Sequence, residues 1–132
     1  MKQLLFILLV SLITLVTGCS NDDSNPLKTG GSGNVPPNVP GNPFPHADTT
    51  IQGPYHIVFS WTGGDPNAED TVKYDLYLSF SSPANDLLAG NLTTAAYDYG
   101  IPSNGSYYWR VVAKDQKGLY SLSPNWHFIL NN

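Results

Sequence analysis

The sequence contains little cysteine and few charged residues. Only one cysteine occurs in 132 residues, which excludes a disulfide framework and any zinc site built from several cysteines. Charged residues make up 12% of the chain, and ten acidic residues against six basic ones give a formal charge of −4. A nucleic-acid-binding protein normally carries a clustered stripe of Lys and Arg. Because this chain is acidic overall, we expect no nucleic acid among its partners.

Recognisable catalytic motifs are also missing. The sequence contains no glycine-rich phosphate loop and no serine or cysteine in a nucleophile motif. Two of its three histidines, His56 and His127, fall on the outward phase of predicted strands, where polar side chains are expected. We therefore expect a protein without enzymatic activity and without a cofactor.

The amino-terminal segment has the pattern of a bacterial export signal. Lys2 precedes an apolar stretch, Leu4–Val16, that is shorter than the roughly 20 apolar residues a membrane-spanning helix needs. The next residues, Val-Thr-Gly-Cys at 16–19, resemble the bacterial lipobox, with the only cysteine at the lipid-carrying position. The resemblance implies cleavage between Gly18 and Cys19, and attachment of Cys19 to a membrane through acyl chains. The alternative is an ordinary secreted protein with an incidental cysteine.

The residues after the cysteine bear on location. Ser20 resembles the residue at this position in lipoproteins sorted to the outer membrane, and Asp22-Asp23 resembles the export tag of certain surface-displayed lipoproteins. These resemblances imply an outer-membrane lipoprotein exposed at the cell surface. A position on the periplasmic face is the alternative.

Composition divides the chain into three parts. Residues 1–18 are the expected signal peptide, and residues 19–43 are rich in Asn, Gly, Pro and Ser. Such a segment buries too little apolar surface to offset its conformational entropy, so we expect residues 19–43 to form a disordered linker. All aromatic residues except Phe6 lie in residues 44–132, which we expect to form the folded domain.

Within residues 44–132, apolar and polar residues alternate in short runs separated by turn-forming residues. Strands are predicted over His56–Trp61, Val72–Leu78, Leu87–Asn91, Thr93–Tyr97, Tyr107–Ala113 and Trp126–Leu130. No stretch shows a helical period bounded by capping residues. About seven short strands at this spacing predict an all-β, antiparallel β-sandwich.

Four stretches of this domain resemble a bacterial fibronectin type III domain, which belongs to the immunoglobulin-like sandwiches. They are FSW at 59–61, YDLYLS at 74–79, YYWRVVAKDQKG at 107–118 and WHF at 126–128. The resemblance implies that Trp61 is the family's buried tryptophan and that Tyr107 occupies the tyrosine-corner position, with Trp109 two residues later pointing inward. Trp126 points inward by its place in the alternation. No Arg-Gly-Asp occurs, so integrin-type adhesion is not implied.

Two tyrosines are the candidate ligand-binding residues. Tyr77 and Tyr108 fall on the outward phase of two strands that are neighbours in this fold, where aromatic rings could stack on a sugar or contact a protein. The alternative is that tyrosine is simply a good strand former. Asp75 and Arg110 are expected to form a cross-strand ion pair on the same face.

One loop gathers oxygen-bearing side chains. Asp65, Asn67, Glu69 and Asp70 could hold Ca²⁺, but they lack the order of an EF-hand and are also common turn residues. The turn interpretation is preferred, and no metal is predicted. Asp48-Thr49-Thr50 and Asp70-Thr71-Val72 resemble a short O-glycosylation signal, which three residues match easily by chance.

Three hypotheses for function follow. The first is a lipid-anchored, non-catalytic envelope protein that displays one interaction module for a protein or envelope partner. The second is a small carbohydrate-binding lipoprotein that uses Tyr77 and Tyr108. The third is a structural spacer.

Overall fold

Five of the six strand segments predicted from the alternation are present in the computed structural model, which describes residues 33–131. The sixth, Thr93–Tyr97, is shifted, because residues 93–95 form a bend and the strand runs over Ala96–Gly100. The strands of this part are β1 (Gly41–Phe44), β2 (Thr49–Gln52), β3 (Ile57–Thr62), β4 (Lys73–Ser79), β5 (Leu87–Leu92), β6 (Ala96–Gly100), β7 (Gly105–Lys114), β8 (Tyr120–Leu122) and β9 (Trp126–Asn131). No helix occurs among these residues, so none there is long and apolar enough to cross a membrane. The sequence did not predict the short strands β1, β2 and β8.

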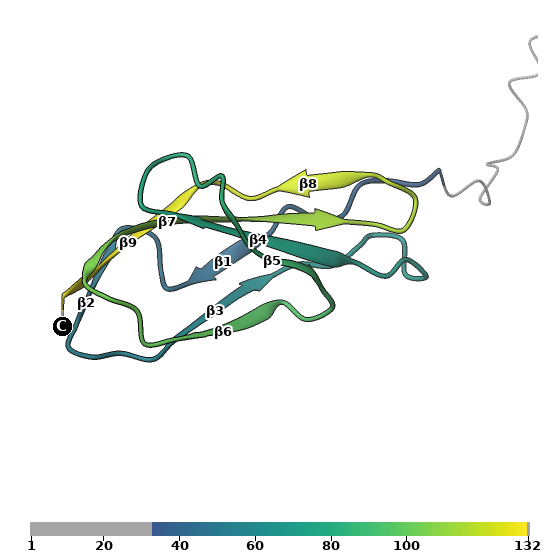
Figure 1. Cartoon of the computed structure of the whole chain (residues 1–132). Helices are drawn as coiled ribbons and strands as arrows, with labels where there is room; N and C mark the ends of the chain where they lie inside the picture. Colours follow the sequence, from purple (N-terminus) through teal and green to yellow (C-terminus); the bar gives the residue numbers. More distant parts are fainter. Residues whose placement is uncertain (1–32, 132) are drawn as a thin grey trace, which may run out of the picture. The chain divides into compact units, whose positions relative to one another are not determined.

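Two sheets pack face to face (Figure 1). The smaller has the order β1-β3-β6, and the larger has the order β2-β9-β7-β4-β5, with β8 also paired to β7. The predicted all-β sandwich is therefore confirmed. Because β4 and β7 lie at the centre of the larger sheet and pair over their whole common length, their outward side chains form one continuous face.

Strand β2 is an exception to the predicted antiparallel arrangement. It runs parallel to β9, with Thr49 opposite Phe128 and Gln52 opposite Asn131. The chain leaves the smaller sheet after β1 and joins the edge of the larger one, where the amide of Asp48 donates to the carbonyl of His127 at 2.6 Å. The four-residue strand TTIQ carries no marked apolar alternation, which is why sequence patterning missed it.

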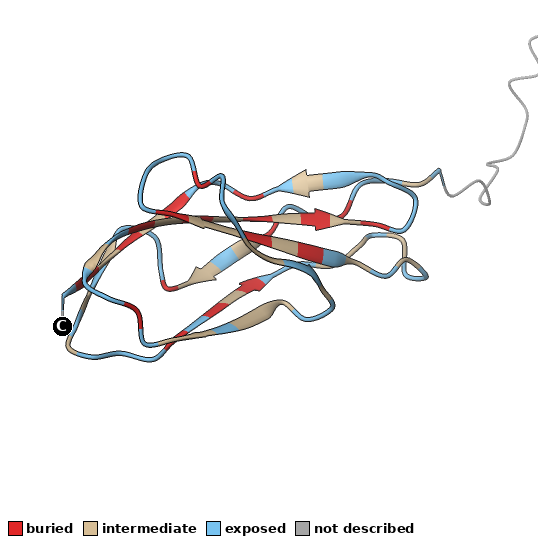
Figure 2. Ribbon diagram, viewed as in Figure 1, coloured by how far each residue is buried: buried red, intermediate tan, exposed pale blue. Residues whose placement is uncertain are grey.

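The core lies between the sheets and consists of the inward side chains of alternating positions (Figure 2). Its buried members are Ile57, Phe59, Trp61, Tyr74, Leu76, Tyr107, Trp109, Val111, Ala113, Trp126, Phe128 and Leu130. Phe59 of the smaller sheet lies 4.9 Å from Trp109 of the larger sheet, centroid to centroid, so this pair bridges the two layers. Trp109 also lies 4.5 Å from Trp126, its neighbour within the larger sheet. Such contacts contribute about 0.5–1.5 kcal/mol beyond the area they bury.

The buried hydroxyl of Tyr107 forms a hydrogen bond with the backbone. Its Oη donates to the carbonyl of Ser103 at 2.7 Å, and its ring stacks on Phe128 with centroids 5.1 Å apart. Burial raises the pKa of Tyr107, with a smaller contribution from Tyr99. The phenol therefore stays a hydrogen-bond donor that fixes the preceding loop to β7, as the tyrosine-corner position implies.

The end of the expected linker is part of the sandwich, which corrects the boundary at Phe44. Residues 33–40, here called the strap, lie along the domain, and Pro37 and Pro40 are buried. The amide of Asn38 donates to Gly64 at 2.9 Å, and the carbonyl of Pro37 accepts from Ser121 at 2.6 Å. Composition predicted disorder here because the ordering contacts come from distant residues of the domain.

Candidate functional site

The two candidate tyrosines lie on the outward face of the larger sheet. Strand register places Tyr77 of β4 opposite Arg110 of β7, and Tyr108 of β7 opposite Ser79 and His127. The two tyrosines are therefore diagonal neighbours, a spacing at which long side chains still interact across strands. Both are half-buried rather than fully exposed.

Each tyrosine ring already has a partner in the chain. The guanidinium of Arg110 lies over the ring of Tyr77, 5.1 Å from its centroid, and the ring of His127 lies 4.7 Å from that of Tyr108. Tyr77, Tyr108, Arg110 and His127 together are called the tyrosine face below. It is a mixed aromatic and cationic surface, and a ligand would meet ring edges, phenol hydroxyls and a guanidinium rather than two bare rings.

The expected ion pair between Asp75 and Arg110 is wrong. Asp75 instead binds Lys114, with Nζ 2.6 Å from Oδ2, while Arg110 donates to Asn85 Oδ1 at 3.1 Å. The register leaves Asp75 diagonal to both cations, since it lies opposite Val112. Arg110 lies directly opposite Tyr77, so the ring and the nearby loop amide hold its head group.

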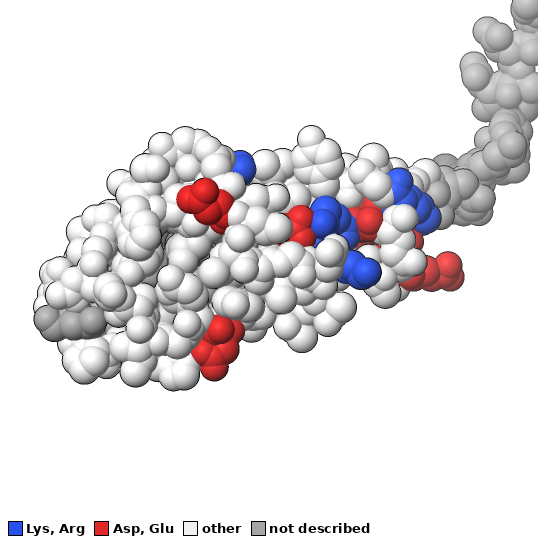
Figure 3. Space-filling model, in the orientation of Figure 1, with Lys and Arg blue, Asp and Glu red and all other residues white. Residues whose placement is uncertain are grey.

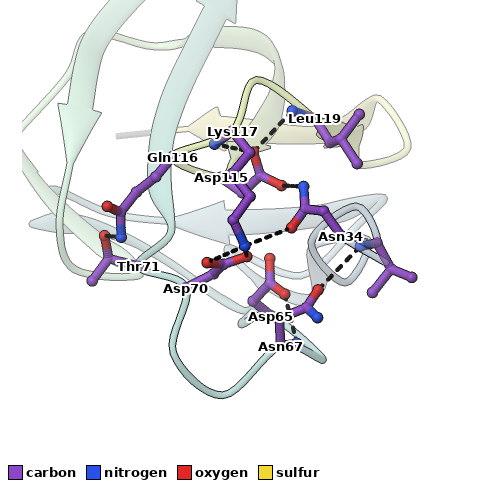
Figure 4. A network of polar contacts seen from close by, with 10 residues as sticks. Asn34, Asp65, Asn67, Asp70, Thr71, Asp115, Gln116, Lys117 and Leu119 are labelled. Atoms are coloured by element: carbon purple, nitrogen blue, oxygen red, sulfur yellow. Dashed lines mark hydrogen bonds and ion pairs between the residues drawn. The ribbon is translucent and has the colours of Figure 1, made fainter. Parts of the chain in front are cut away.

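A second cluster of polar side chains lies where two loops and the strap meet (Figure 4). Asp65 and Asp70 come from the loop after β3, and Asp115 comes from the loop after β7. One carboxylate oxygen from each lies within 4.8 Å of the others. We call this region, formed by residues 63–71, residues 115–119 and the strap, the loop end.

Backbone amides and one lysine hold the carboxylates of the loop end. Asp115 Oδ1 accepts the amides of Lys117 at 2.8 Å and Leu119 at 2.9 Å, and its Oδ2 accepts Asn34 Nδ2 at 2.6 Å. Burial acts to raise the pKa of Asp115, but these hydrogen bonds outweigh it and hold the pKa below its usual range. Lys117 Nζ binds both oxygens of Asp70, at 2.8 and 2.9 Å, and this contact raises the pKa of Lys117.

The sequence pointed to only part of this cluster. Asp65 and Asp70 belong to the loop singled out for Ca²⁺, but Glu69 is exposed, and Asn67 turns its Oδ1 toward the amide of Val35 at 3.0 Å. Asp115 was not considered, because it lies far from that loop in the chain. In the predicted sandwich, the loops after β3 and β7 lie next to each other. This adjacency could have identified Asp115 as a member of the cluster.

Charge is unevenly spread over the domain. On the face shown in Figure 3, most Lys, Arg, Asp and Glu side chains gather toward the end of the sandwich where β7 ends, and most of the rest of the face is uncharged. Three of the four cations within residues 33–131 lie on β4, β7 or the following loop near this end: Lys73, Lys114 and Lys117.

The histidines lie in separate surroundings. His46 contacts Phe44 edge-on, His56 binds Asp98 with a separation of 2.5 Å, and His127 lies 3.5 Å from Asp48 as well as against Tyr108. The hydrogen bond from His56 lowers the pKa of the exposed Asp98. The histidine contacts in this part of the chain are thus to carboxylates and rings.

The lipobox residues Gly18 and Cys19 lie outside the described residues, so cleavage and lipidation stay predictions. The candidate O-glycosylation threonines are described. Thr49 and Thr50 lie in β2, and the hydroxyl of Thr71 accepts a hydrogen bond from Gln116 at 2.5 Å.

Comparison with known proteins identifies the fold. No protein-family model matches the sequence, and no curated protein matches it. A solved Fn3-like protein from Clostridium thermocellum has a TM-score of 0.51 to this chain at 23% sequence identity, over 74% of this chain and 94% of that one. The fold is fibronectin type III-like. The resemblance of residues 59–128 to such domains is confirmed at the level of this fold, and the fibronectin type III-like sandwich carries the tyrosine face on its larger sheet.

Proposed function

We propose that this chain is a non-catalytic, lipid-anchored protein of the cell envelope that displays one interaction module. The observation that carries the interaction role is the tyrosine face, where Tyr77 and Tyr108 lie side by side with Arg110 and His127 on a continuous sheet surface. Tyrosine and arginine are enriched at protein interfaces because they offer large contact area with polar tips. The proposed partner is a protein or a glycan of the envelope.

The anchor rests on the lipobox motif at 16–19 and on its single cysteine. Several acyl chains on one residue hold a protein at a membrane far better than one, since each buried CH₂ contributes about 0.8 kcal/mol. Ser20 and the acidic pair behind it favour the outer membrane and surface exposure over the periplasmic face.

A carbohydrate-binding lipoprotein is the second candidate. The phenol hydroxyls of Tyr77 and Tyr108 and the guanidinium of Arg110 supply hydrogen-bonding groups beside aromatic rings, a combination that suits a sugar. The structural spacer is the third candidate, and it predicts no ligand at this face.

The experiment has two arms. Metabolic labelling with a fatty-acid analogue should mark the wild type and not Cys19→Ala, and labelling that persists in the variant would contradict the lipoprotein assignment. In the second arm, the full chain is applied to a glycan array and to an envelope-protein pull-down. Replacing Tyr77 and Tyr108 together by Ala should abolish binding while the melting midpoint moves little.

Val112→Ala is the matched control for the second arm, because it removes apolar area from the same outward side of β7 without touching a ring. Binding that survives in the double variant would move the site to the loops at 63–71 or 114–119. A wild type that binds nothing in either screen would favour the spacer.

A further inference from the structure

The loop end contains a buried carboxylate oxygen that the fold leaves without a partner. Asp65 Oδ1 accepts the amide of Asn67 at 2.7 Å, but Asp65 Oδ2 is buried and receives no hydrogen bond from the residues that the structure describes. Leaving a carboxylate oxygen in this condition costs free energy, and buried polar atoms in native proteins are almost always paired. Besides the hydrogen bond to Asp70, the charge of Asp65 helps to raise the pKa of the nearby Lys117, but the ammonium of Lys117 donates no hydrogen bond to Asp65 Oδ2. This oxygen is therefore free to coordinate a cation.

The neighbours of this oxygen are also acidic and buried. The side chain of Asp70 is only 7% exposed, and Asp115 is 9% exposed. Together with Asp65, they supply three carboxylates whose closest oxygens lie within 4.8 Å of one another. Oxygens bound to one Ca²⁺ ion at 2.3–2.6 Å are separated by no more than about 5 Å, so the cluster has the size of a calcium site.

The charges of the cluster do not balance. Three carboxylates face one ammonium group, that of Lys117, because the nearby Lys114 is bound to Asp75. A formal excess of two negative charges remains, which one divalent cation would neutralise. The side chain of Lys117 is 54% exposed, so its ammonium can swing into solvent when a metal takes its place.

We infer that Asp65, Asp70 and Asp115 bind one Ca²⁺ ion, which displaces Lys117 from Asp70. Asn34 Oδ1 lies 3.3 Å from Lys117 Nζ, so the strap can supply a fourth oxygen ligand at the same place. Water completes the coordination shell. Ca²⁺ fits better than Mg²⁺ because these ligands come from two loops and a strap, and Ca²⁺ accepts irregular sets of six to eight oxygens.

The ion would join three segments that are distant in the chain. Asp65 and Asp70 lie before β4, Asp115 follows β7, and Asn34 belongs to the strap that enters the domain. Bound Ca²⁺ would therefore fix the point where the amino-terminal segment joins the sandwich. Sites of this kind in extracellular modules bind Ca²⁺ with dissociation constants of about 10⁻⁴–10⁻³ M.

The test measures Ca²⁺ binding by equilibrium dialysis with ⁴⁵Ca²⁺, and the melting midpoint with Ca²⁺ or EDTA, on the full chain in detergent. The wild type should bind one ion and melt at a higher temperature in Ca²⁺. Asp65→Asn keeps the shape and the Oδ1 acceptor but loses a charged ligand, so its affinity should fall about tenfold or more. Lys117→Gln removes the competing ammonium, so it should bind Ca²⁺ more tightly than the wild type.

Glu69→Gln is the matched control, since it removes one negative charge from an exposed residue of the same loop outside the cluster. It should leave the affinity unchanged, and an equal loss in this variant would show nonspecific charge attraction and overturn the site. The inference is also overturned if the wild type binds no Ca²⁺ at millimolar concentrations, if Asp65→Asn binds as tightly as the wild type, or if Mg²⁺ binds equally well. Unchanged affinity in Lys117→Gln would overturn the displacement of the lysine.

Discussion

The inner face of the sandwich and its loop end are stabilised by different interactions. On the inner face, the ring of Trp109 lies within 5 Å of the rings of Phe59 and Trp126, centroid to centroid, and these buried rings exclude water. At the loop end, the carboxylate of Asp115 accepts two backbone amides and the side chain of Asn34. The inner face depends on volume and shape, whereas the loop end depends on charge.

This difference predicts how each region responds to change. A smaller side chain on the inner face leaves a cavity, and its cost should not depend on pH. A change of charge at the loop end removes no packing, so its effect should depend on protonation and on bound cations. Three substitutions test this contrast, from the largest expected effect to the smallest.

Trp61→Ala tests the inner face. Trp61 is 5% exposed and packs edge-on against Tyr74, so its removal should lower the free energy of unfolding by about 3–5 kcal/mol, out of the 5–15 kcal/mol typical of a domain. Denaturant unfolding of the full chain measures the loss. Val58→Ala, on the outward side of the same strand, should cost far less. If both variants lose the same free energy of unfolding, the assignment of Trp61 to the buried side of β3 and Val58 to the outward side is wrong.

Gly63→Ala tests the border between the two regions, where β3 gives way to the loop end. A Cβ on Gly63 would lie 2.5 Å from Tyr74 Oη and 2.9 Å from its Cε1. Tyr74 is buried against Trp61 and has little room to move, so the clash should cost about 1–3 kcal/mol. Thermal melts measure it. Gly33→Ala, with no atom within 4 Å of the new Cβ, is the control, and a Gly63 variant as stable as this one would contradict the packing described.

Asp115→Asn tests the loop end through its pH dependence. The pKa of Asp115 is lower in the folded chain than in the unfolded one, so the unfolded state takes up the proton first. The stabilisation is present above the ordinary Asp pKa, near 3.9, and is lost as the pH falls through the lower folded value. The variant should therefore show a flatter decline of melting midpoint below about pH 4, measured in EDTA. A decline as steep as that of the wild type would show that Asp115 is not responsible.

More of the inner face than of the rest of the domain could be predicted from the sequence. The alternation of Ile57, Phe59 and Trp61 predicted which side of β3 is buried, because the two-residue period of a strand is a local property of the chain. The same reasoning placed Tyr77 and Tyr108 outward. It could not show that Arg110 covers one ring and His127 the other, since these contacts depend on the register between strands.

The tertiary structure, not the local sequence, orders the strap and brings the acidic residues of the loop end together. Composition alone predicted disorder for residues 33–40, because it counts only the residues of the segment, whereas Asn34 and Asn38 are held by loops far along the chain. Asp115 meets Asp65 only because the sandwich places the loops after β3 and β7 at one end. The sequence by itself determined the strands with marked alternation, β3, β4, β7 and β9, and their buried sides, since these follow from a local pattern. The fold determined which distant side chains meet, since loop adjacency and register are set by the packing of the whole domain.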